Sequence, residues 1–379
     1  MREVCIVGTS MIRFGRYPEL DYTGLAVPAV VGALADAGAT PADVEVAYCG
    51  HSYGGPLTGQ RILRGLGMTG PPVINVENAC SSGSTALREA WTAVGAGVYD
   101  VALVIGVDKL TQFGGGTLPL ASEDWEVAGG MVMPAVYAMR AQRYMMERGA
   151  TREDLAAVAV KARAHGIANP VAQMRKETTV EEVLGSRPIA DPLTLFQCCP
   201  TGDGAAAAIV CAREVADRFD ATPISILASG LHSGRYTPGH RDMATAEITV
   251  GTAKEAYEQA GVGPEDLDVV ELHDAFTIAE LMYYEALGLC EPGEAPSLLK
   301  RGETSLGGSI PVNPSGGLLA KGHPIGATGT AQLVEVVRQL QGRCEDRQIE
   351  GARVGLIHAT GGGISGLDHG ACSIHILAR

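Results

Sequence analysis

The chain has 379 residues, a formal net charge of −14 and 50 glycines, with 46% hydrophobic but only 5% aromatic residues. This acidic balance argues against nucleic acids and anionic membranes as main partners, because both are bound by basic surfaces. The nine cysteines show no CxxC or CxxH spacing, so neither a disulfide framework nor a metal site is expected.

The N-terminal part of the chain has the alternating pattern of an α/β protein. Residues 4–10, VCIVGTS, predict a strand that leaves no room for a signal peptide, and no apolar run approaches the ~18 residues of a membrane helix. We therefore expect a soluble cytoplasmic protein. Further strands are predicted at 44–50, 73–76 and 101–108, with a helix that ends at Gly38 and another over 83–97.

An insertion follows at about 109–204, as its mixture of helical patterns and Gly/Pro-rich loops indicates. Helices are predicted at 134–149 and 151–166. Its last segment, CCPTGDGAAAAIVCA (198–212), predicts a strand of small residues that returns to the first half. An insertion of this length usually covers or completes a site.

An internal repeat organises the whole chain. The segment AGATPADVEV (37–46) recurs as AGVGPEDLDV (260–269), an offset of 223 residues. Matching strand patterns occur at 224–230, 267–274 and 354–363, with a helix at 329–342. Two β-α-β halves with largely apolar strands indicate sheets that are covered by helices.

A lone cysteine, Cys80, lies between the strand at 73–76 and the helix that starts near Ser84. A helix N-terminus stabilises a thiolate, so this position favours a nucleophile with a lowered pKa. On this segment alone a small buried hydrophobe is an equal alternative. The repeat aligns Gly83 with Gly329 and so places Cys80 opposite His323 in the loop KGHPIGATG. A Cys–His pair of this kind is what thiolate attack requires.

Two further histidines, His273 in ELHDAFT and His358 in LIHATGGG, follow predicted strands, where α/β sheets bind ligands. The glycines at 361–363 lack GxGxxG spacing, which argues against a nicotinamide dehydrogenase, and fit better as N–H donors to an oxyanion. Five other histidines are expected to be structural or on the surface: His165, His232, His240, His369 and His375.

The ordered motifs NACSSGSTAL, HDAFT, NPSGGLLAKGHPIGATG and HATGGG resemble the thiolase superfamily over essentially the whole chain, and most closely its sterol-carrier-protein-type and archaeal-type branch. The resemblance implies the thiolase fold, with two βαβαβαββ halves that form a five-layered αβαβα sandwich and an inserted loop domain. The expected halves are 1–222 and 223–379. It also implies CoA thioesters as substrates, no permanently bound cofactor, and a homodimer or tetramer.

The resemblance assigns roles residue by residue. Cys80 matches the acyl-accepting nucleophile, and His323 matches the histidine that activates it and donates to the thioester oxygen of the second substrate. Gly361 matches the glycine whose N–H completes an oxyanion hole. Phe276 and Cys199 are the expected CoA-binding residues, with Phe276 at the border of the acyl or pantetheine channel.

This sequence departs from the family at its second catalytic cysteine, because the two positions that carry it hold Ala275 and Ala359. The α-carbon base is then expected to be a histidine that titrates near its reference pKa of about 6.5. We favour His358, which adjoins Ala359, and expect His273 to orient a water in the oxyanion hole.

Three functions remain open on the sequence alone. The leading one is an acyl-CoA C-acyltransferase that uses a Cys80 acyl-enzyme for Claisen condensation or thiolysis. The second is a thiolase-like carbon–carbon lyase with a small zinc-ribbon/OB-type partner. Such aldolases resemble this branch but lack the cysteine and have a disrupted GHP block. The third is a CoA-thioester-binding subunit without Claisen activity.

Overall fold

The computed structural model describes residues 1–236, 241–366 and 368–379. The strands are β1 (Val4–Met11), β2 (Val46–Gly50), β3 (Val73–Val76), β4 (Val101–Lys109), β5 (Pro188–Ala190), β6 (Leu193–Thr194), β7 (Asp203–Ala212), β8 (Ile224–Ser233), β9 (Val269–Glu271), β10 (Val354–Gly361) and β11 (Ala371–Ala378). The helices are α1 (Tyr22–Ala37), α2 (Thr58–Gly65), α3 (Ser82–Gly95), α4 (Trp125–Ala128), α5 (Met133–Arg148), α6 (Arg152–Ile167), α7 (Val180–Leu184), α8 (Glu247–Ala260), α9 (Thr277–Ala286), α10 (Ala295–Lys300), α11 (Gly317–Ala320) and α12 (Thr328–Leu340).

The predicted internal repeat is confirmed by the sheet. Within the described residues, nine strands pair in the order β3-β2-β4-β7-β1-β8-β11-β10-β9. The two halves meet at β1 and β8, and each runs outward through the equivalent strands. Beyond β9, Val270 forms a parallel bridge with Val312, which stands where β3 pairs with β2 in the first half. The helices α1 and α8 also end alike, at Gly38 and Gly261, both in the left-handed conformation that glycine tolerates.

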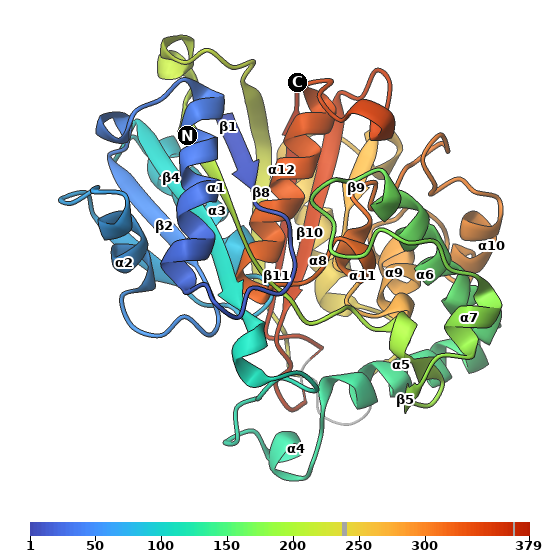
Figure 1. Ribbon diagram of the computed structural model, residues 1–379. Helices are drawn as coiled ribbons and strands as arrows, with labels where there is room; N and C mark the ends of the chain where they lie inside the picture. The colour runs from blue at the N-terminus through green and yellow to red at the C-terminus, as the bar shows by residue number, and fades with distance from the viewer. Residues whose placement is uncertain (237–240, 367) are drawn as a thin grey trace.

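Helices and strands alternate in five layers, as expected for the thiolase fold. One outer core joins α1 to β1, β4 and β7, and the other joins α8 and α9 to strands of the second half. The middle core packs α3 and α12 between strands of both halves, and α12 lies near the centre of the molecule in Figure 1. Strand β7 is buried throughout, and its small side chains allow helices to approach both of its faces.

The N-terminal ends of the two central helices touch, and this contact positions the site. A Cβ on Gly329 would lie 2.2 Å from the Ser84 hydroxyl, and one on Gly83 would lie 2.6 Å from the Gly326 carbonyl. Only glycine permits such close approach at both positions. The segments that precede the two helices, which carry Cys80 and His323, are therefore held against each other.

The insertion contains α4 to α7 and the β5–β6 ribbon, drawn in teal to green in Figure 1. Its helices α5 and α6 pack against α9, and α6 also packs against α11. The chain then returns through Cys198, whose backbone forms an antiparallel β-bridge with Phe276. It continues into β7, which lies between β4 and β1 in the sheet. This confirms the predicted return of the segment to the first half. In the described residues, no helix combines the length and apolar character needed to cross a membrane.

Candidate active site

Cys80 lies in a tight turn between β3 and α3. The turn is closed by hydrogen bonds from the Ser81 N–H to the Asn78 carbonyl and from the Ser82 N–H to the Ala79 carbonyl, both 3.0 Å. Ala79 adopts a positive φ of 48°, which is uncommon for a residue with a side chain. The turn presents the thiol at the start of the helix, as the sequence predicts, and leaves it partly exposed.

The predicted encounter of Cys80 with His323 is confirmed, with 3.3 Å between the sulfur and Nε2. On the other side of the ring, Nδ1 lies 2.6 Å from the Thr328 hydroxyl, which in turn donates to the Pro324 carbonyl. Since a hydroxyl carries a single hydrogen, we assign the Nδ1–H as the donor to Thr328. Nε2 is then unprotonated and faces the thiol as a proton acceptor.

His273 completes a compact cluster. One of its ring nitrogens, the Cys80 sulfur and a ring nitrogen of His323 all lie within 4.8 Å of one another, and the two imidazole rings meet edge to face at 5.0 Å. Nδ1 of His273 contacts the Thr360 hydroxyl at 3.2 Å, whereas Nε2 is buried and has no hydrogen-bond partner among residues 1–236, 241–366 and 368–379. A buried polar atom without a partner is costly, so Nε2 is available to a bound substrate or water.

The geometry argues against our preference for His358 as the base. This histidine is fully buried, its Nε2 contacts the Thr249 hydroxyl at 3.0 Å, and its Nδ1 accepts the His273 N–H at 3.5 Å. Both ring nitrogens are therefore engaged, and the edge of its ring packs against Tyr283. His358 supports His273 from behind, because the β10 strand turns its side chain into the core next to Ala359 rather than toward Cys80.

The pKa of Cys80 is shifted in the direction opposite to that expected of an acidic thiol. Burial, with smaller effects of Asp108 and Glu77, raises the pKa of Cys80 to about 12, although hydrogen bonds from backbone N–H groups lower it. Burial likewise lowers the pKa of His323 to about 3, and burial among other histidines holds the pKa of His273 well below its ordinary value. The site at neutral pH thus contains a neutral thiol and neutral imidazoles, and the pull of the helix N-terminus does not overcome the loss of hydration.

Gly361 lies beside the cysteine turn at the end of β10. A Cβ on Gly361 would lie 2.0 Å from the Asn78 carbonyl, so this glycine lets the end of β10 approach the turn. The backbone N–H of the next residue, Gly362, lowers the pKa of the Cys80 thiol. The role of Gly361 as an oxyanion donor stays a prediction.

The two expected CoA-binding residues lie beside the His273 segment. The Phe276 ring stacks on Tyr137 of α5 with centroids 4.4 Å apart. The Cys199 N–H donates to the Ala275 carbonyl at 2.9 Å, and its thiol lies near enough to Cys80 for a charge on Cys80 to raise the pKa of Cys199. Cys199 belongs to the end of the insertion, whereas Phe276 belongs to the second half and is covered by Tyr137 of the insertion.

The described histidines that were expected to be structural do make structural contacts. His165 contacts the Asn313 carbonyl at 2.9 Å, His232 contacts Thr252 at 3.0 Å, His369 contacts the Tyr137 hydroxyl at 2.9 Å, and His375 contacts the Ser84 carbonyl at 3.1 Å. His240 lies outside the described residues.

Sequence reasoning missed two residues that hold this cluster, Thr328 and Thr360, which fix two ring nitrogens. Thr328 lies five residues after His323 and belongs to the quoted GHPIGATG motif, so its position carried a usable signal. Thr360 is recognisable only once β10 and β9 are seen as parallel neighbours.

Comparison with known proteins matches residues 4–214 to the thiolase N-terminal domain and 231–371 to a thiolase C-terminal domain-like model. The benzoylsuccinyl-CoA thiolase subunit BbsB of Thauera aromatica is 46% identical over 96% of this chain and 95% of its own length. An acetyl-CoA acetyltransferase of Methanothermobacter thermautotrophicus is 40% identical over the full length of both chains. Among solved structures, the Ltp2-ChsH2(DUF35) aldolase superposes with a TM-score of 0.88 at 27% identity, covering 100% of this chain and 98% of that one. The chain belongs to the thiolase family of acyltransferases.

Proposed function

We propose that this acyltransferase forms an acyl-enzyme on Cys80 and resolves it by Claisen condensation with a second acyl-CoA, or by thiolysis with free CoA in reverse. The observation that carries the proposal is the 3.3 Å contact between the Cys80 sulfur and Nε2 of His323, with His273 beside both. A metal ion could also use these three side chains, but it would occupy the sulfur lone pair that acyl transfer requires.

In the first half-reaction the thiol attacks the thioester carbonyl of an acyl-CoA. The S–H proton passes to Nε2 of His323, the new sulfur–carbon bond forms, and the bond to CoA breaks. The proton then passes from His323 to the departing CoA sulfur. Because the resting thiol and imidazole are neutral, proton transfer accompanies the attack instead of preceding it. The Gly362 N–H supports the developing charge near the sulfur.

In the second half-reaction a base removes a proton from the α-carbon of a second acyl-CoA. We assign this base to His273, since its Nε2 is buried, unpartnered and next to the nucleophile. The resulting carbanion attacks the acyl carbon on Cys80, a carbon–carbon bond forms, and the thiolate leaves and regains its proton from an imidazolium. For His323 to donate to the thioester oxygen during enolate formation, its proton must move from Nδ1 to Nε2, and the Thr328 hydroxyl then donates to Nδ1 instead of to the Pro324 carbonyl.

The test is intact-protein mass spectrometry after incubation with acetyl-CoA and longer acyl-CoA thioesters. We expect the mass to rise by one acyl group on wild type, and the Cys80→Ala variant to remain unlabelled while it keeps its circular dichroism spectrum. Persistent labelling of Cys80→Ala would refute the assignment. Absence of labelling on wild type would instead favour the two alternatives, a retro-aldolase or a CoA-thioester-binding subunit.

We further propose a homodimer that forms through β3. This strand lies at the end of the sheet next to β2, and its Ile74 side chain is 39% exposed. An open edge of this kind pairs readily with a second copy. The expected mass from analytical ultracentrifugation is that of two chains or, for a tetramer, four.

Additional proposals concern partners and location. A small zinc-ribbon/OB-type partner is supported by two relatives: one is named a subunit, and the name of the related aldolase structure includes a DUF35 component. Co-expression with such a partner and copurification tests this. We propose that the boundary between the two halves lies between residues 222 and 223, and that the protein is located in the cytoplasm.

A further inference from the structure

The segments that carry the two site histidines are joined by a buried ion pair. Glu271 ends β9, two residues before His273, and Lys321 follows α11, two residues before His323. Their charged groups lie 2.9 Å apart, with the Lys321 side chain 1% exposed and that of Glu271 fully buried. The pair therefore connects the backbone on either side of the candidate site without facing the substrate.

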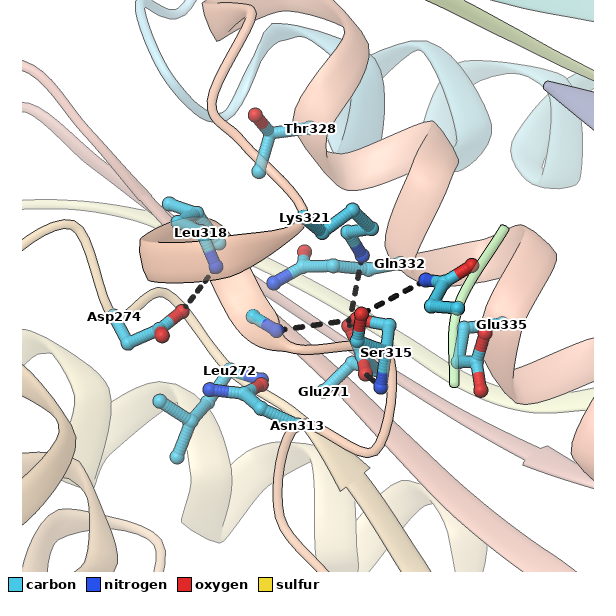
Figure 2. Close-up of polar contacts among 12 residues, drawn as sticks. Glu271, Leu272, Asp274, Asn313, Ser315, Leu318, Lys321, Thr328, Gln332 and Glu335 are labelled. Carbon is cyan, nitrogen blue, oxygen red and sulfur yellow. Dashed lines mark hydrogen bonds and ion pairs between the residues drawn. The ribbon is translucent and has the colours of Figure 1, made fainter. Parts of the chain in front are cut away.

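Glu271 uses both carboxylate oxygens in this connection, as Figure 2 shows. One oxygen accepts the Ser315 N–H at 3.1 Å, and the other accepts the Ser315 hydroxyl at 2.7 Å and the Lys321 ammonium at 2.9 Å. Ser315 belongs to the NPSGG loop that leads into α11. A single carboxylate thus fixes both the loop and the residue that precedes the GHP motif.

A second carboxylate, that of Asp274, also connects the His273 segment to the 315–321 segment. It lies on the other side of His273 from Glu271. Asp274 accepts the N–H groups of Leu318 at 2.7 Å and of Leu319 at 3.4 Å. Gly317 has a φ of +59°, and a Cβ there would lie 2.2 Å from the Asp274 carboxylate, so glycine is needed for this contact. The His273 backbone is consequently held between Glu271 and Asp274, both of which bind the 315–321 segment.

Stability alone does not account for a buried ion pair here. Burying two charges costs hydration that their attraction only partly restores, and packed apolar side chains of similar size often serve as well. Resting on the proposed function, we propose that Glu271 and Lys321 are positioning residues, which set the distance of His273 and His323 from each other and from Cys80. Neither residue touches the substrate in this proposal.

The chain offers a matched control. Glu335 and Arg347 form another buried ion pair, also 2.9 Å apart and with side chains 5% and 7% exposed. Glu335 lies on α12, and Arg347 follows that helix. Glu335 lies near enough to Glu271 and Lys321 for their charges to act on one another, but among the described residues its hydrogen bonds go to Gln339, Cys344 and Arg347 and not to either histidine-bearing segment. Loss of this pair should disturb the fold to a comparable degree while leaving the spacing of the histidines unchanged.

The experiment compares the double variants Glu271→Gln/Lys321→Met and Glu335→Gln/Arg347→Met with wild type. Three rates are measured: acylation of Cys80 by acetyl-CoA, solvent-deuterium exchange at the α-carbon of acetyl-CoA, and alkylation of Cys80 by iodoacetamide. Since a misplacement of about 1 Å costs roughly 100-fold, we expect the first variant to lose ~10- to 100-fold in kcat and in exchange, with KM changed less than about twofold. The control variant should keep wild-type kcat at a similar loss of thermal stability.

The proposal is overturned if the two double variants lose kcat equally, or if the Glu271/Lys321 variant retains wild-type rates. Should that variant fail to fold, Ser315→Ala decides, because it removes only one donor to Glu271 and should lower exchange several-fold without changing KM. If wild type itself forms no acyl-enzyme, the proposed function fails. The iodoacetamide rate, which needs no substrate, still tests whether the ion pair sets the Cys80–His323 geometry.

Discussion

Alkylation of Cys80 as a function of pH distinguishes a neutral cysteine–histidine pair from a resting ion pair. Burial raises the thiol pKa from the ordinary 9.0 to about 12. At pH 8 a thiol of pKa 9.0 is about one-tenth ionised, whereas one of pKa 12 is ionised to roughly one part in 10⁴. We therefore expect Cys80 to react with iodoacetamide about 10³-fold more slowly than an unhindered cysteine at this pH, and to gain rate steadily up to pH 10.

The assay is site-resolved mass spectrometry of the Cys80 peptide after short exposures to iodoacetamide between pH 5 and 10. Free cysteine under the same conditions provides the reference rate. His323→Asn serves as the matched variant, because it removes the imidazole but leaves a polar side chain of similar reach. A reactivity that reaches its plateau below pH 8 in wild type, and loses this plateau in His323→Asn, would refute the neutral pair and restore the thiolate–imidazolium pair that the sequence indicates.

The remaining predictions concern the histidines. His323→Ala should lose both half-reactions by roughly 10²- to 10³-fold, since one ring both moves the Cys80 proton and stabilises the oxyanion; acylation and condensation rates measured separately check this. His273→Asn should abolish deuterium exchange at the α-carbon of acetyl-CoA while Cys80 acylation persists, whereas His358→Gln should reduce exchange only partly; unchanged exchange in His273→Asn would contradict its assignment as base. The pKa values of His323 and His375 are both lowered by burial to about 3. As the pH falls below about 6.5, these histidines are therefore protonated in the unfolded chain before they are protonated in the folded one. Each should lower the free energy of unfolding by about 2 kcal/mol at pH 5 relative to pH 7. Urea unfolding at both pH values measures this loss, and it should shrink in His375→Gln.

Sequence patterns predicted the parts of the fold that depend on local periodicity and on the repeat. The strands at 4–11 and 101–109 and the helices α3 and α12 lie within two residues of their expected limits. The encounter of Cys80 with His323 was predictable because pseudo-symmetry placed two helix starts together, and Gly83 and Gly329 already signalled close approach there. Equivalent positions in a repeat carry this information across 243 residues of chain.

Burial and side-chain direction were not predictable in the same way. A strand pattern shows that His358 follows apolar residues, but not that its ring turns into the core to contact Thr249 while His273 faces the thiol. The placement of Cys80 at a helix start correctly indicates an electrostatic field that favours the thiolate. The pKa of the thiol also depends on how much water the surrounding chain excludes. That exclusion is a property of the packed tertiary structure, and short-range motifs do not encode it.

The absence of a second cysteine at Ala275 and Ala359 is consistent with the character of the site that remains. A thiol of ordinary pKa that is buried becomes a weaker acid and is mostly protonated, so it could not serve as base without an added activator. Burial lowers the pKa of an imidazole, which keeps the ring neutral and its nitrogen free to accept a proton, although it also makes the ring a weaker base. His273 is thus kept in the form that a base requires by the same desolvation that raises the pKa of Cys80. The Thr360 hydroxyl on Nδ1 orients that ring, while Glu271 and Asp274 hold the backbone on either side of it. A buried site with two histidines can therefore perform proton transfers for which a second cysteine would need its own activating partner.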